Sequence, residues 1–189
     1  MPSSDIEAFD LEAEVRDLAA RRDIMGAVQR YMRGLDRLDP ALQRSAFHDG
    51  AFVDCGLMAG DADAFVEFAQ GFLGAVDASH HLLGQVDVAI AGDTAQGECY
   101  FQAWHATNDA AGQPRDLFIA GRYVDEYARR GGQWRITHRK LITDWVRDEA
   151  ADHSFYSANP DTNRGGRRGA DFSQTRAWTH GASTAKEVS

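Results

Sequence analysis

Cysteine is scarce in this sequence: only Cys55 and Cys99 occur among its 189 residues. They are far apart and lack the close Cys-x-x-Cys spacing that is typical of zinc sites. Free cysteines without such spacing behave as small apolar side chains. We therefore interpret both as buried apolar residues.

The histidines also lack a metal-binding pattern. None of them forms the helical His-x-x-x-His pair that places two imidazoles on one face. This absence of a compact ligand spacing applies to His48, His80, His81, His105 and His138. The sequence therefore predicts no metal site.

Long apolar runs are absent as well. No stretch approaches the roughly 20 apolar residues that a membrane-spanning helix needs. The first residues lack the basic-then-apolar pattern of a secretory signal. We therefore expect a cytoplasmic protein with no membrane partner.

Positive charge is in deficit. The sequence has 20 Lys and Arg against 29 Asp and Glu, which gives a formal net charge of −9. Nucleic-acid binding depends on clustered positive charge. The composition therefore argues against nucleic acid or another polyphosphate as a partner.

Length and composition favour one globular domain followed by a tail. With 43% hydrophobic and 26% charged residues, a chain of 189 residues can form a single core with room for a pocket. Beyond about residue 150 the chain is rich in Gly, Ser, Asn, Thr and Arg. We predict a domain over residues 1–149 and a tail over residues 150–189 that is partly disordered, covers the pocket or contacts another subunit.

The first half of the sequence has the periodicity of amphipathic helices. Ser4 followed by Glu7 resembles a capping box and predicts the start of the first helix. The predicted helices cover residues 4–23, 21–37, 40–47 and 65–76.

The second half has the two-residue periodicity of strands, interrupted by glycine-containing turns. The predicted strands cover residues 51–58, 81–90, 95–107, 117–129 and 133–146. Short connections imply antiparallel neighbours. Helices followed by a meander of long strands predict an α+β fold, in which a curved antiparallel sheet wraps around the N-terminal helices and forms a cone with an internal pocket.

One acidic residue continues the apolar face of the second predicted helix. Asp36 lies four residues after Met32 and eight after Val28, so the three side chains form one row. A carboxylate removed from water is costly unless it is paired or hydrogen-bonded. We therefore expect a partner for Asp36, and an imidazole is the natural candidate.

Four segments together carry a resemblance to a known family. They are residues 31–36 (YMRGLD), 81–85 (HLLGQ), 123–127 (YVDEY) and 131–139 (GGQWRITHR). In this order they resemble the SnoaL-like branch of the nuclear-transport-factor-2-like superfamily. Within that branch, the chain is similar to the cofactor-free lyases scytalone dehydratase, hexachlorocyclohexane dehydrochlorinase and bile-acid 7α-dehydratase.

This resemblance implies a cone of about six strands, often assembled as a trimer, that contains an Asp-His pair and needs no cofactor. A homo-oligomer is therefore expected, with a trimer favoured and a dimer as the alternative. Carried over by position, the pair is Asp36 and His81. Tyr31 stands where the bile-acid enzyme has a tyrosine, and Arg139 matches an active-site arginine of the dehydrochlorinase.

These residue types suit an elimination reaction. His81 can accept a proton near neutral pH while Asp36 holds its other ring nitrogen. Tyr31 can donate to a leaving hydroxyl or a carbonyl, and Arg139 can stabilise the charge that develops there. We expect a cofactor-independent lyase that eliminates water, or cleaves a carbon–carbon bond in a retro-aldol manner, on a hydrophobic, aromatic or polycyclic oxygenated molecule.

Strand alternation leaves two choices open. In strict alternation His81 shares a face with Gln85, while His80 faces the same side as Val86. A bulge near Gly84 would reverse this order and turn His81 inward. Arg139 has the same ambiguity against its neighbours His138 and Lys140.

The substrate pocket is harder to define, because ordinary apolar residues shape it. The proposed pocket walls are Phe52, Phe101, Ile119 and Tyr123. Two other functions stay open: a ketosteroid-isomerase-like or polyketide-cyclase-like enzyme, and a non-catalytic small subunit of a ring-hydroxylating dioxygenase or another ligand-binding protein.

Overall fold

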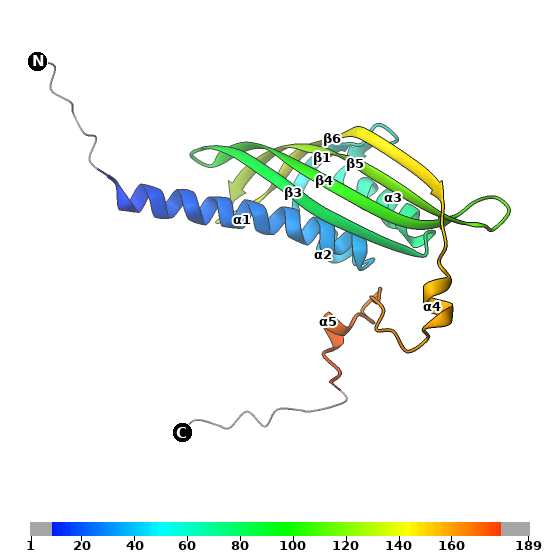
Figure 1. The fold of residues 1–189 in the computed structure, drawn as a ribbon. Helices are drawn as coiled ribbons and strands as arrows, with labels where there is room; N and C mark the ends of the chain where they lie inside the picture. Colours follow the sequence, from blue (N-terminus) through cyan, green and yellow to red (C-terminus); the bar gives the residue numbers. More distant parts are fainter. Residues whose placement is uncertain (1–8, 179–189) are drawn as a thin grey trace, which may run out of the picture.

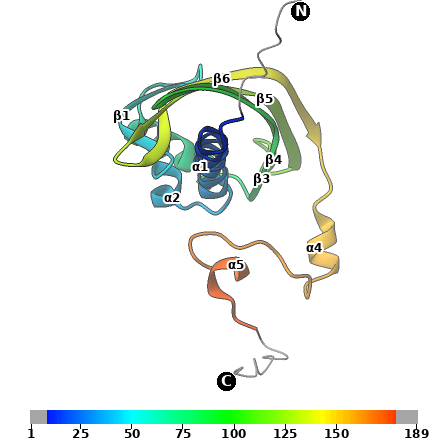
Figure 2. The same ribbon diagram turned by 90° about the vertical axis from the view of Figure 1, so that its left-hand side faces the viewer.

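One long helix lies in the hollow of a curved six-stranded sheet (Figures 1 and 2). The structure is a computed structural model, and it describes residues 9–178. The helices are α1 (Leu11–Asp36), α2 (Pro40–Arg44), α3 (Ala62–Gly74), α4 (Ser154–Ala158) and α5 (Phe172–Thr175). None of the described helices is long and apolar enough to cross a membrane.

Helix α1 is continuous where the sequence predicts two successive helices. The carboxylate of Asp10 caps it by accepting hydrogen bonds from the backbone N–H groups of Glu12 and Ala13 at 3.0 Å. No proline interrupts the segment that follows, so the two predicted helices merge into one. The predicted start at Ser4 lies outside the described residues.

The sheet confirms the predicted α+β class and corrects one detail of its pairing. Its strand order is β2-β1-β6-β5-β4-β3, and β3 to β6 form an antiparallel meander. Strand β1 pairs with β6 in parallel, so the sheet is mixed and not wholly antiparallel. The strands are β1 (Phe47–Asp54), β2 (Ala59–Asp61), β3 (Ala78–Ala91), β4 (Thr94–Asn108), β5 (Pro114–Arg130) and β6 (Gln133–Ala150).

The core forms between the concave face of the sheet and helices α1 and α3 (Figure 2). Tyr31 of α1 lies at its centre, edge-on to the rings of Phe47 and Tyr123 at centroid distances of 5.8 and 5.4 Å. The ring of Phe65 from α3 stacks on Tyr31 at 6.2 Å. This aromatic cluster joins α1, α3, β1 and β5. It forms the floor of the pocket described below.

A glycine sets the distance between α1 and α2 next to Asp36. A Cβ atom added at Gly34 would lie 2.5 Å from the backbone nitrogen of Gln43 and 2.7 Å from its Cα. Backbone cannot move away as a flexible side chain can. Gly34 therefore allows the close approach that fixes the end of α1.

Replacing Gly34 with alanine should lower the free energy of unfolding by about 1–3 kcal/mol, because the new methyl group overpacks this contact. Gly71→Ala is the matched control, since nothing lies within 4 Å of a Cβ on this exposed residue of α3. The control should stabilise the protein by up to about 1 kcal/mol. Urea unfolding of both variants checks this, and equal effects would contradict the proposed close approach.

Candidate active site

An apolar pocket of about 480 Å³ opens between α1, α3 and the concave face of the sheet. Its size lies in the range of small-molecule sites. Most of its wall is aliphatic or aromatic. The polar side chains in the wall are Tyr31, Cys55, His81, His105, Tyr123 and Thr143. The pocket therefore combines an apolar surface with a few convergent polar groups.

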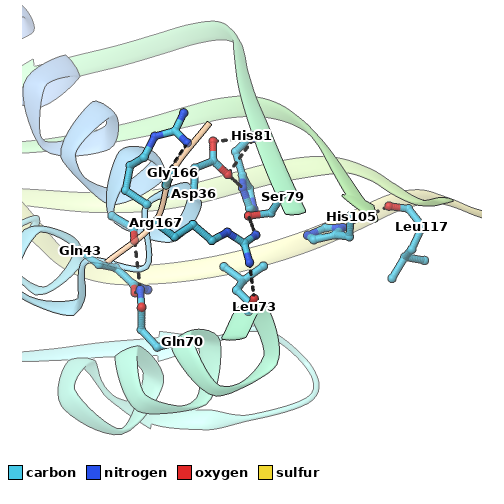
Figure 3. A network of polar contacts seen from close by, with 12 residues as sticks. Asp36, Gln43, Gln70, Leu73, Ser79, His81, His105, Leu117, Gly166 and Arg167 are labelled. Carbon is cyan, nitrogen blue, oxygen red and sulfur yellow. Dashed lines mark hydrogen bonds and ion pairs between the residues drawn. The ribbon is translucent and has the colours of Figure 1, made fainter. Parts of the chain in front are cut away.

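The structure brings Asp36 and His81 together (Figure 3). The Oδ1 atom of Asp36 lies 2.7 Å from Nδ1 of His81. The same carboxylate accepts the backbone N–H of His81, with Oδ2 at 2.9 Å. Because a carboxylate only accepts, Nδ1 carries the hydrogen and the lone pair of a neutral ring is on Nε2. Asp36 thereby fixes both the tautomer and the orientation of His81.

A bulge turns His81 inward and resolves the choice left open between His80 and His81. The β3–β4 register shifts between Leu83 and Val86, so Ser79, His81 and Leu83 face inward before the bulge, as Val86 does after it. His81 lines the pocket. Its neighbour His80 is on the exposed face of the sheet, where it lies near Trp104.

Tyr31 and Tyr123 both line the pocket and are nearly inaccessible to solvent. Burial raises the pKa of Tyr31, although the charge of Arg139 opposes this. Burial also raises the pKa of Tyr123 well above its ordinary value. Both phenols therefore carry their protons at neutral pH and can donate hydrogen bonds.

Arg139, which the resemblance matches to an active-site arginine, lies behind the pocket wall and not in it. Its Nε and Nη2 atoms donate to the two carboxylate oxygens of Asp125 at 2.7 and 2.6 Å. Its guanidinium carbon lies 4.2 Å from the ring centroid of Tyr31 and 4.1 Å from that of Tyr123. Arg139 can therefore act on a bound molecule only through the two tyrosines.

The ion pair of Arg139 and Asp125 is wholly buried. Burial lowers the pKa of Arg139, but the charge and hydrogen bonds of Asp125 outweigh it and raise that pKa well above its ordinary value. Tyr127 donates a further hydrogen bond to Asp125 at 2.7 Å. The pair is charged, closed to solvent and bound to the aromatic floor of the pocket.

Three of the four residues proposed as substrate-pocket walls line this pocket, and one does not. Phe101, Ile119 and Tyr123 line the pocket. Phe52 does not, since it is 47% exposed and pairs with Asp61 at the β1–β2 edge. Alternation in β1 buries Ala51 and Val53, so it turns Phe52 to the outer face.

His105 was not predicted to be a pocket residue, but it is 3% exposed and lines the pocket. Its ring is edge-on to that of His81, with the centroids 5.5 Å apart. The carbonyl of Leu117 lies 3.1 Å from Nδ1 and can only accept, so Nδ1 carries the hydrogen. Burial, assisted by the nearby His81, lowers the pKa of His105 to about 4. His105 is therefore a neutral hydrogen-bond acceptor.

Alternation along β4 could have identified this residue. Cys99, Phe101 and Ala103 are buried at every second position, and His105 is the next member of that series.

Cys99 is a buried apolar residue as expected, whereas Cys55 is only half-buried and lines the pocket. Residues 9–178 contain no group of three or more His, Cys, Asp or Glu side chains suited to a metal ion.

The curved, mixed sheet packed on an N-terminal helix, with an apolar pocket between them, defines the class of cone-shaped α+β domains. Residues 16–140 match the family model of the SnoaL-like domain, and the chain belongs to this family. The predicted membership of the SnoaL-like branch of the nuclear-transport-factor-2-like superfamily is thereby confirmed. No curated protein is similar enough in sequence to be recognised as a relative.

Solved structures share the fold at low sequence identity. A putative scytalone dehydratase from Novosphingobium aromaticivorans is 20% identical, with a TM-score of 0.63 over 72% of this chain and 91% of that one. The hexachlorocyclohexane dehydrochlorinase LinA-type3 from Novosphingobium barchaimii is 17% identical, with a TM-score of 0.66 over 74% and 97%.

A third structure is the β subunit of a putative aromatic-ring-hydroxylating dioxygenase from Novosphingobium aromaticivorans. It is 22% identical, with a TM-score of 0.54 over 70% of this chain and 94% of that one. Proteins described as a putative dehydratase, a dehydrochlorinase and a putative dioxygenase subunit thus share this fold. The fold alone does not determine the reaction, which depends on the residues of the site.

The neutral state of His105 should make stability depend on pH. The unfolded chain protonates this imidazole below about pH 6.5, whereas the folded chain does so only near pH 4, so acid favours unfolding in that window. His105→Gln removes this effect. When the pH falls from 7.5 to 5, the free energy of unfolding of the wild type should decrease by about 2 kcal/mol more than that of the variant. Urea unfolding at both pH values measures this, and parallel pH profiles would contradict it.

Arg139→Gln should lower the free energy of unfolding by about 3–5 kcal/mol, because it leaves the charge of Asp125 buried without a partner. The control is Lys140→Gln, which removes an exposed ion pair with Asp54. The control should cost under about 1 kcal/mol. Thermal or urea unfolding distinguishes the two, and a small effect at Arg139 would argue against a charged buried pair.

Proposed function

We propose that this protein is a cofactor-independent lyase that acts on a hydrophobic, ring-bearing oxygenated molecule. The hydrogen bond of 2.7 Å between Asp36 and His81, at the wall of an apolar pocket, is the observation that supports this most directly. Family membership is compatible with such an activity, since the similar structures include proteins described as a dehydratase and a dehydrochlorinase.

The proton is removed by His81 in this proposal. Its Nδ1–H is bound to Asp36, so the free lone pair on Nε2 is the base. Asp36 stabilises the imidazolium that forms, because its charge lies next to the ring. The imidazolium can then return the proton to a departing hydroxide as water, which regenerates the base.

Two phenols and a second imidazole orient the substrate. The protonated Tyr31 and Tyr123 can donate to a carbonyl oxygen that gains negative charge as the proton leaves. The positive charge of Arg139 behind their rings favours this charge without contacting the substrate. His105 can accept a hydrogen bond from a substrate hydroxyl through Nε2.

The same arrangement accommodates retro-aldol cleavage. In this reaction the base removes the proton of a β-hydroxyl, the carbon–carbon bond breaks, and its electron pair leaves negative charge on the carbonyl oxygen as an enolate, which the returned proton then neutralises. Isomerisation needs a base that returns the proton to another carbon of the substrate, and His81 has the chemistry for this as well. A ligand-binding role alone would need no base held by a buried carboxylate.

The proposal is tested by turnover on a panel of hydroxylated cyclic ketones that become conjugated when water is lost. Formation of the alkene is followed by ultraviolet absorbance, and products are identified by mass spectrometry. His81→Ala and Asp36→Asn should each lower kcat/KM by about 10²–10⁴-fold, because one removes the base and the other its orienting charge.

His80→Ala is the matched control, because this neighbouring imidazole is on the opposite face of β3. Its kcat/KM should stay within about twofold of the wild type. Undiminished turnover in both His81→Ala and Asp36→Asn would reject the proposed mechanism. Binding of panel members without any turnover in the wild type would favour a ligand-binding role instead.

A further inference from the structure

The C-terminal segment returns to the helix that carries Asp36. After β6 the chain passes α4 and then turns back beneath α1 and α2 (Figure 2). The backbone N–H of Arg168 donates to the carbonyl of Arg37 at 2.8 Å. In return, the guanidinium of Arg37 donates to the carbonyl of Gly166 at 3.3 Å. The segment is thus joined to the residue that follows Asp36.

A tight turn shapes this contact. Asp171 is 7% exposed, lies 3.5 Å from the guanidinium of Arg37 and accepts the N–H groups of Gly166 and Ser173 at 2.8 and 2.9 Å. A Cβ atom at Gly166 would lie 2.7 Å from the backbone of Ala170, so the turn requires glycine there. The hydroxyl of Ser173 accepts a hydrogen bond from Arg33 of α1 at 2.9 Å. Residues 165–173 therefore form a defined turn that hydrogen bonds and an ion pair attach to α1 and to Arg37.

The turn directs the side chain of Arg167 toward the Asp36–His81 pair (Figure 3). Its guanidinium donates to the carbonyls of Leu73 and Val76 at 3.1 and 2.8 Å, and to the hydroxyl of Ser79 at 2.9 Å. The carbonyl of Leu73 is at the C-terminus of α3, where a cation is favoured. Ser79 and His81 share the inward face of β3. One side chain thus joins the end of α3 to the start of the strand that carries the base.

The charge of Arg167 also acts electrostatically on residues of the proposed site. Burial lowers the pKa of Arg167, while the negative charge of Asp36 opposes this effect. The charge of Arg167 in turn contributes to the lowered pKa of His105. A half-buried cation therefore lies close enough to Asp36 and to His105 to affect their surroundings electrostatically.

We propose that Arg167 is a positioning residue for Asp36 and His81, and that residues 165–173 complete the active site from the C-terminal segment. The effect of Arg167 on catalysis rests on the proposed function, whereas its contacts do not. The segment fixes the two ends of the pair, through Arg37 next to Asp36 and through Ser79 two residues before His81. Its positive charge lies close to the carboxylate of Asp36, which holds Nδ1 of His81.

The test uses full-length protein and diethyl pyrocarbonate, which modifies neutral imidazoles, with peptide mass spectrometry as the readout. The titratable groups around His81 are Asp36 and Arg37 at the end of α1, His105 on β4, and Arg167. The variants are Arg167→Gln, Arg167→Lys and the control Arg164→Gln. Arg164 belongs to the same part of the chain but stacks on the exposed ring of Tyr156 at 4.0 Å.

In Arg167→Gln, the pH at which labelling of His81 reaches half its plateau should rise, because a nearby cation is lost. The plateau rate should rise several-fold as the pair becomes accessible. Arg167→Lys should keep the midpoint, since it keeps the charge, and Arg164→Gln should match the wild type. His138, whose side chain is 60% exposed, is the internal reference in every sample.

An unchanged midpoint in Arg167→Gln overturns the proposal, even if the plateau rises, because a purely structural contact would expose His81 without changing its proton affinity. A midpoint shift of equal size in Arg164→Gln overturns it too. Labelling needs no substrate. Its outcome is therefore independent of whether His81→Ala and Asp36→Asn abolish turnover.

Discussion

The hydrogen bond between Asp36 and His81 is the interaction on which the proposed site depends. A carboxylate that is 8% exposed needs a donor, and His81 supplies two, its ring Nδ1–H and its backbone N–H. This pairing joins the last residue of α1 to the start of β3. The close approach at Gly34, the bulge after Leu83 and the C-terminal segment each constrain one side of it.

A second buried ion pair performs a different task in the same molecule. Arg139 and Asp125 are closed to solvent and support the rings of Tyr31 and Tyr123 from behind. The two acidic residues therefore divide their roles by position. Asp36 is bound to an imidazole at the pocket wall, whereas Asp125 is bound to a guanidinium behind the rings of Tyr31 and Tyr123, where the ion pair is closed to solvent.

Local patterns predicted much of the fold. The two-residue periodicity located the four long strands, and the apolar row of α1 placed Asp36 in the interior. The merging of the first two helices was missed, because two overlapping local patterns do not show whether the chain bends between them. The parallel pairing of β1 with β6 was missed because it joins segments far apart in the chain, and short turns give no information on such pairs.

The sequence by itself determined the α+β class through its periodicity. Its short motifs carried the resemblance that identified the family and, by position, the Asp-His pair. Tertiary structure decided which residues meet the pocket. It turned His81 inward through a bulge, placed Arg139 behind two tyrosines and added the contact of Arg167. The reason is physical: facing depends on one-residue shifts in register and on contacts between distant segments, and neither is encoded in a local pattern.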